Sequence, residues 1–187
     1  MEGLEALKAR ARLYPLNLAM LVAAILLGAL TPAPHDLLEE TYTKYKELIA
    51  SLGLEESPFD VAVYRVFVHN LYAASTMYVP ILGIGFALYA AYVTGLAVQA
   101  LAVMEAKSLW VIMASLLLVP STWIEVLAYS IAVTESMFLG RAIMKRGRRG
   151  EFTISLAMLI LVASLLLLSA SIELMIARLA FRGWSGA

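Results

Sequence analysis

Long apolar runs, separated by short charged segments, make up most of this chain. The runs cover residues 13–30, 61–104, 108–119, 121–140 and 152–180. A helix needs about 20 apolar residues to cross the ~30 Å hydrocarbon core of a bilayer. The pattern therefore predicts an all-α, polytopic membrane helical bundle with about five hydrophobic segments, formed by a single membrane domain over residues 1–187.

A proline separates the third and fourth apolar runs of the chain. Residues 108–119 are too short to span a bilayer, and Pro120 separates them from 121–140. Proline ends or kinks a helix, and the bilayer supplies no water for the freed backbone groups. We expect a proline-broken or re-entrant helix pair at Pro120, with Thr122 and Glu125 forming a capping box at the new helix start. A second interpretation, compatible with the first, is an intramembrane proton or ion site at Glu125, as in transporters with broken helices.

Residues 35–60 form a polar interlude with seven acidic and two basic side chains. Apolar residues recur within it at helical spacing, at Leu38, Tyr42, Tyr45, Ile49 and Leu52. This stripe predicts an amphipathic helix. One interpretation is a helix that rests on its own membrane domain or on the lipid surface. The other is a docking face for a protein partner at residues 35–52.

Two rows of small residues repeat every fourth position in the apolar runs. Such rows let helices approach closely in lipid, where van der Waals packing drives their association. The rows therefore predict that these helices pack against each other or against copies of themselves in a homo-oligomer. Their members are Gly83, Ala87, Ala91 and Gly95 in the first run and Ala128, Ala132, Ser136 and Gly140 in the second.

Basic residues favour the cytoplasmic side of a membrane. They gather in two segments, with three before the first apolar run (Lys8, Arg10 and Arg12) and five within residues 141–149. We therefore expect a multi-pass protein of the cell membrane with a cytoplasmic N-terminus. Residues 31–60 and the C-terminus are then outside.

Several polar side chains lie inside the apolar runs and form a candidate intramembrane site. A charge at the bilayer centre costs about 2.5–3.5 kcal/mol on insertion scales, so each charged residue of this set is expected to have a partner. We expect Arg65 to bond to an acid, with Glu173 as the candidate, and Glu135 either to snorkel or to pair with a basic residue of a neighbouring helix. His69 is interpreted as a packing residue or, alternatively, as a ligand. The candidate set is Glu125, Thr122, Ser121, His69, Asn70, Arg65 and Glu135.

Composition narrows the function classes. Fourteen basic and fourteen acidic residues cancel, which argues against a nucleic-acid partner. The chain has no cysteine and only two histidines, so no metal motif is expected. No catalytic set or phosphate loop is recognisable, and we expect a protein without a cofactor that is not an enzyme.

Four short motifs resemble the stage II sporulation protein M family of integral membrane proteins, over roughly residues 65–143. The matching positions are the run from Phe67 to Asn70, the pair Gly83 and Gly85, Thr94 with Gly95, and Pro120, Glu125, Ala128 and Gly140. Ser121 and Thr122 stand where the family pattern has histidine and glycine. The resemblance implies a five-helix, non-enzymatic protein of a membrane-remodelling assembly.

Two functions follow as expectations. The first is a non-enzymatic membrane subunit that scaffolds or recruits partners, in contact with the lipid bilayer. The alternative is a small transporter or channel subunit with a polar site at Glu125, His69 and Asn70.

Overall fold

The computed structural model describes residues 2–54, 57–144 and 149–184. Within these ranges the chain forms eight α-helices and no strand. The helices are α1 (Glu2–Ala11), α2 (Tyr14–Leu30), α3 (His35–Leu52), α4 (Phe59–Met77), α5 (Gly83–Met104), α6 (Leu109–Leu118), α7 (Pro120–Met144) and α8 (Arg149–Trp184).

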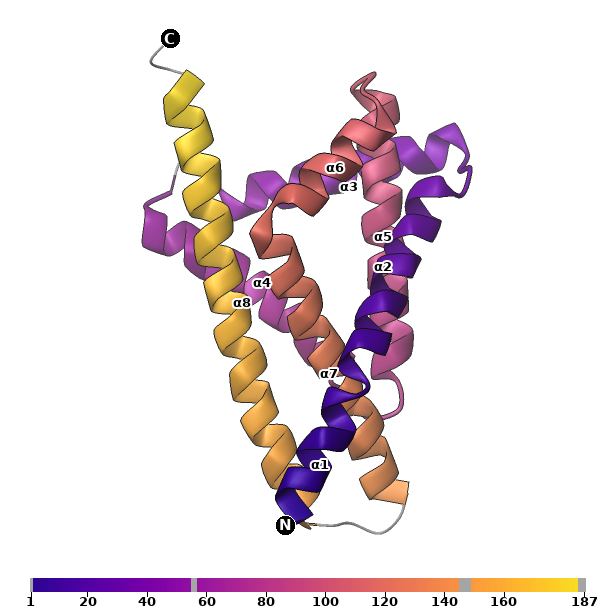
Figure 1. The fold of residues 1–187 in the computed structure, drawn as a ribbon. Coiled ribbons are helices and arrows are strands. Elements are labelled where there is room, and N and C mark those ends of the chain that lie inside the picture. Colours follow the sequence, from indigo (N-terminus) through magenta and orange to yellow (C-terminus); the bar gives the residue numbers. More distant parts are fainter. Residues whose placement is uncertain (1, 55–56, 145–148, 185–187) are drawn as a thin grey trace.

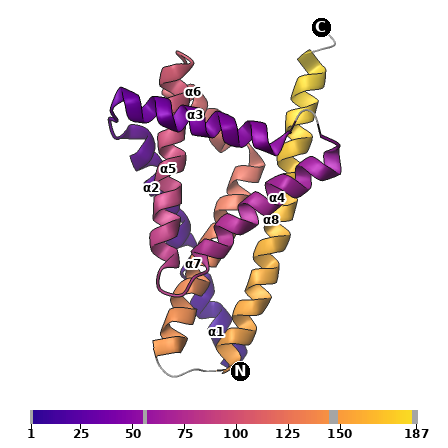
Figure 2. The same cartoon turned by 180° about the vertical axis from the view of Figure 1, so that it is seen from behind.

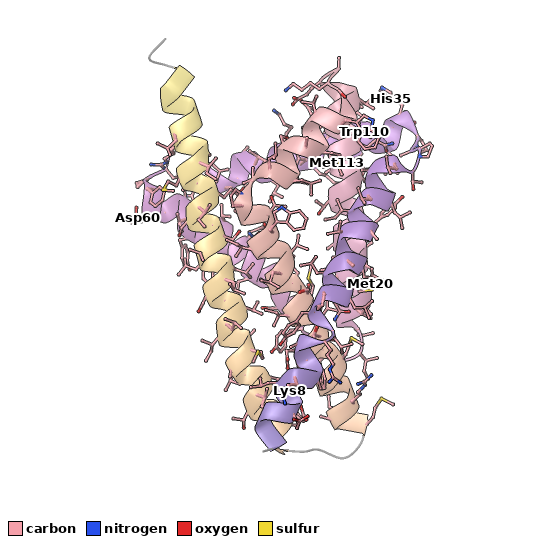
Figure 3. All side chains as sticks on the ribbon, in the orientation of Figure 1. Lys8, Met20, His35, Asp60, Trp110 and Met113 are labelled. Carbon is pink, nitrogen blue, oxygen red and sulfur yellow. The ribbon has the colours of Figure 1, made fainter. Side chains whose placement is uncertain are left out.

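Most helices run lengthwise between two ends of the molecule. α1, the end of α7 and the start of α8 meet at one end, whereas α3 and α6 lie across the opposite end (Figures 1 and 2). Lys8 lies at the first end, and His35 and Trp110 lie at the second (Figure 3). We refer to these as the α1 end and the α3 end.

Among the residues that the structure describes, four helical segments are long and apolar enough to cross a membrane. They are Glu5–Leu30, Gly83–Met104, Pro120–Met144 and Gly150–Leu179. α4 runs obliquely across α7 and α8, in front of them in Figure 2; it carries Asp60 and Arg65 and is not among the four. α6 has only ten residues, too few to span a bilayer alone.

α2 and α5 pack with almost no space between their backbones. A Cβ atom added to Gly95 would lie 1.9 Å from the carbonyl oxygen of Ile25, and one added to Gly28 would lie 2.0 Å from that of Tyr92. Both distances are far shorter than any van der Waals contact, so only glycine fits at these positions. The close approach lets the two helices exchange dispersion contacts along their length.

α7 is the central helix, and the small residues of its row are buried against neighbouring parts of the bundle. Ala128 and Ala132 have no exposed surface, and a Cβ atom added to Gly140 would lie 2.9 Å from the Ile81 side chain. About two thirds of its membrane-length window is buried, against 22% for α8. Both rows of small residues therefore make close contacts within this chain, the first through Gly95 with α2 and the second through Gly140 with Ile81.

α3 rests on the membrane-length helices, as one interpretation of the sequence expected. It begins after Pro34 and ends at Gly53, whose left-handed backbone (φ 56°) is one that glycine adopts without strain. Its apolar side packs against α5, where Leu38 meets Leu96 and Ala100. Figure 2 shows α3 crossing in front of α5.

The helix break at Pro120 has a different cap from the one predicted. α6 ends at Leu118, Val119 is extended, and α7 begins at Pro120 itself. Proline suits the first helical position because it has no N–H that would need a partner. Thr122 thus lies inside the helix, and its amide donates to the carbonyl oxygen of Val119 at 3.2 Å.

The predicted capping box between Thr122 and Glu125 is therefore wrong. No hydrogen bond joins the side chain of either residue to the backbone of the other in the part of the chain that the structure describes. Trp123 closes the break instead, because its indole Nε1–H donates to the Leu117 carbonyl oxygen at 2.8 Å. This bond satisfies a carbonyl that α6 leaves free at its last turn.

Candidate functional site

A buried ion-pair cluster lies at the α1 end. The Arg10 side chain has no exposed surface. Its Nε donates to Glu135 Oε1 on α7 at 2.7 Å, and its Nη2 donates to Glu151 Oε2 on α8 at 2.6 Å. The guanidinium also stacks over the Phe138 ring, 4.2 Å from the ring centroid. One cation thus bridges two helices that are joined in sequence only through residues near 145–150.

Hydrogen bonds from uncharged side chains extend this cluster. Ser155 Oγ donates to the second oxygen of Glu135 at 2.5 Å, so both carboxylate oxygens of this buried acid have partners. The Tyr78 hydroxyl donates to the Ser155 carbonyl oxygen. On α2, Asn17 Nδ2 donates to Thr134 Oγ1 at 2.7 Å. These bonds tie α1, α2, α7, α8 and the α4–α5 turn together in a fully satisfied polar network.

The cluster decides between the two expectations for Glu135 and changes the role assigned to Arg10. Glu135 pairs with a basic residue of a neighbouring helix, which confirms that alternative over snorkelling. Arg10 was counted with Lys8 and Arg12 as a marker of the cytoplasmic side, yet Lys8 is exposed and Arg10 is not. The available sequence signal was Glu135 itself, since an acid within an apolar helix requires a cation.

A second polar feature is a cavity halfway along the bundle. Its volume is about 110 Å³. Its polar lining comes from Glu125, Tyr129 and Thr122 of α7 and Thr94 of α5. Its apolar lining consists of Leu21, Ile25, Met77, Ala87, Ala90, Ala91, Leu116 and Val126.

The chemistry of this cavity is that of a carboxyl group in apolar surroundings. Glu125 and Tyr129 lie one helical turn apart on α7, and both side chains line the cavity. Glu125 forms no ion pair with any residue that the structure describes. The cavity offers no group of three metal-ligating residues, and none is found elsewhere among the described residues.

No protein-family model matches this chain, and no curated protein or solved structure is significantly similar to it. The resemblance to the stage II sporulation protein M family is therefore an expectation from short motifs. The site has to be interpreted from its own geometry.

The other members of the predicted intramembrane site lie apart from the cavity. His69 is exposed on α4, Asn70 is buried on the same helix, and neither lines the cavity. Ser121 is buried at the start of α7, where its carbonyl oxygen accepts from Ser169 Oγ of α8 at 2.9 Å. The structure thus brings together only Glu125 and Thr122 from the predicted set and adds Tyr129 and Thr94.

The expected bond between Arg65 and Glu173 is absent. Arg65 Nη1 donates instead to the Leu52 carbonyl oxygen at 3.3 Å and to Ser57 Oγ at 3.0 Å. Arg65 lies near the start of α4, close to the end of α3, where a free carbonyl needs a donor. The exposed guanidinium can also reach water, so it does not need a buried carboxylate.

Proposed function

We propose that this chain is a non-enzymatic, multi-pass membrane subunit that presents the acidic face of α3 to a protein partner with a basic surface. α3 is the observation that carries the proposal. Its apolar side is occupied by contacts with α5, so the helix is held in place by its own domain. Its polar side is free to meet a second protein.

The polar side of α3 carries four acidic residues against two exposed lysines, Lys44 and Lys46. Its four acidic residues, Asp36, Glu39, Glu40 and Glu47, are all exposed. One of them is paired, because Lys44 Nζ donates to Glu40 Oε1 at 2.6 Å, and this ammonium holds the pKa of the Glu40 carboxyl below its usual value. The excess of acidic over basic side chains on this face favours association with a basic surface and raises its rate.

The proposed topology places this face outside the cell membrane. Five helices would each cross the membrane once, with α6 as a short re-entrant piece before α7. These five are α2, α4, α5, α7 and α8. Lys8 and Arg141 at the α1 end then lie in the cytoplasm, in line with the preference of basic residues for that side. The resemblance to a five-helix family of membrane-assembly proteins supports the same arrangement.

The partner is proposed to be a different protein rather than a second copy. A homo-oligomer through the small-residue rows loses its main support, because Gly95 and Gly140 already contact Ile25 and Ile81 of the same chain. An acidic face would also repel its own copy, since like charges brought together at an interface destabilise it.

A photo-crosslinking amino acid tests this proposal in native membranes. Placed at Glu47 of α3, it is expected to give a discrete adduct with another protein. Exchanging Glu39 and Glu40 for lysine in the same chain should reduce this adduct at least several-fold, because the charge complementarity is lost. The matched control is Tyr72 of α4, which is 73% exposed and should give no protein adduct. An adduct of twice the mass of this chain, or none from Glu47, would contradict the proposal.

A small transporter or channel subunit is the second candidate, and one observation favours it. The Glu125 carboxylate lines a cavity beside a broken helix, which is the arrangement found in transporters with discontinuous helices. Such a protein would lose its ion flux in proteoliposomes when Glu125 is replaced by glutamine. A scaffold would show no flux in either form.

A further inference from the structure

We propose that the Glu125 cavity binds a small organic cation, a primary ammonium group on a short apolar body. If this protein is a transporter, the cavity is its substrate site. If it is a scaffold, the cavity is a ligand site that senses the cation in its surroundings. Binding and transport are therefore separate claims.

The first argument is charge. Glu125 lies in the second turn of α7 and lines the cavity beside Ala87 and Ala91 from the first half of α5. An ionised carboxylate at the bilayer centre is stabilised by a positive partner, because its insertion alone costs about 2.5–3.5 kcal/mol. Arg10 compensates Glu135 in this way, but Glu125 has no such ion pair among the described residues.

The second argument is the shape and polarity of the lining. An apolar cavity of about 150 Å³ can hold a molecule as large as benzene, so about 110 Å³ suits a body of roughly four carbon atoms. The apolar lining side chains would contact that body. The hydroxyl oxygens of Thr94, Thr122 and Tyr129 could accept the N–H bonds that the carboxylate leaves free.

The third argument is selectivity against metal ions. Calcium takes six to eight oxygen ligands and magnesium six, and both prefer carboxylates and carbonyl groups. Glu125 is the sole carboxylate that lines the cavity, and the described residues contain no group of three metal-ligating side chains. An ammonium group needs only three acceptors, which the cavity provides.

Calorimetric titration of the full chain in lipid nanodiscs tests the site. The probe is n-butylammonium chloride, and n-butanol is the uncharged probe of similar size. We expect one saturable site for butylammonium and at least tenfold weaker binding of butanol. Glu125→Gln should weaken butylammonium binding at least tenfold, and Tyr129→Phe, which keeps the ring, should weaken it several-fold.

The control is Glu173→Gln, which removes another acid of the bundle that does not line the cavity. It should leave butylammonium affinity within about twofold of the unmodified chain. Equal binding of butanol, equal binding to Glu125→Gln, or no saturable binding to the unmodified chain would each overturn the proposal. Saturable binding without any protein-dependent cation flux in proteoliposomes would keep the site and remove the transporter candidate.

Discussion

Replacing Arg10 with methionine is expected to lower the free energy of unfolding by about 3–5 kcal/mol. The guanidinium neutralises Glu135, which has no exposed surface, and also holds Glu151. Its removal leaves a buried carboxylate without a cation, and this costs far more than the loss of the contact itself. Reversible unfolding in mixed detergent micelles, followed by tryptophan fluorescence, measures the change.

Lys8→Met is the matched control for Arg10→Met. Lys8 lies on the same helix and pairs with Glu5 at 3.0 Å, but both side chains of this pair are largely exposed. Its loss should cost less than about 1 kcal/mol. Adding Glu135→Gln to Arg10→Met should recover part of the loss, because the unpaired charge is then gone. Equal effects of Arg10→Met and Lys8→Met would show that the cluster does not hold the helices together.

Gly95→Ala is expected to have the second large effect, a loss of about 1–3 kcal/mol or more in the free energy of unfolding. The new methyl group would lie 1.9 Å from the Ile25 carbonyl oxygen and 2.7 Å from the Ala29 amide nitrogen. Both are backbone atoms of α2, so the two helices would have to move apart. The same unfolding measurement applies.

Gly85→Ala provides the control on the same helix. No heavy atom lies within 4 Å of the position that its methyl group would take. Alanine favours helix over glycine by about 0.8–1.0 kcal/mol in a helix interior, so Gly85→Ala should be neutral or stabilising. If Gly95→Ala behaved in the same way, the close contact of α2 with α5 would be contradicted.

Much of the fold is predictable from the sequence because it depends on local patterns. Hydropathy alone indicates the apolar helices, Pro120 marks the break between α6 and α7, and the spacing of Leu38 and Tyr42 indicates the amphipathic α3. The small-residue rows indicate where helices approach closely. They do not name the partner helix, since Gly95 meets α2 through Ile25 in a contact across the bundle.

The candidate site was less predictable because its contacts join distant parts of the chain. Arg10 and Glu135 are 125 residues apart in the sequence. Because Arg10 stands between Lys8 and Arg12, its sequence context is that of an ordinary charge at the membrane interface. The capping box failed for a local reason, since Pro120 takes the first helical position and moves Thr122 into the helix. Tyr129 was missed because a tyrosine four residues after Glu125 gives no distinctive signal in sequence.

The proposed function requires that the acidic face of α3 lie on the opposite side of the membrane from α1. The chain has no native cysteine, so single cysteines can be introduced without first removing any. Thr43 of α3 and Ala9 of α1 are both exposed and suit this purpose. Labelling intact cells with a membrane-impermeant maleimide should modify Thr43→Cys at once and Ala9→Cys only after the membrane is permeabilised. Labelling of Ala9→Cys in intact cells, or protection of Thr43→Cys, would contradict the account.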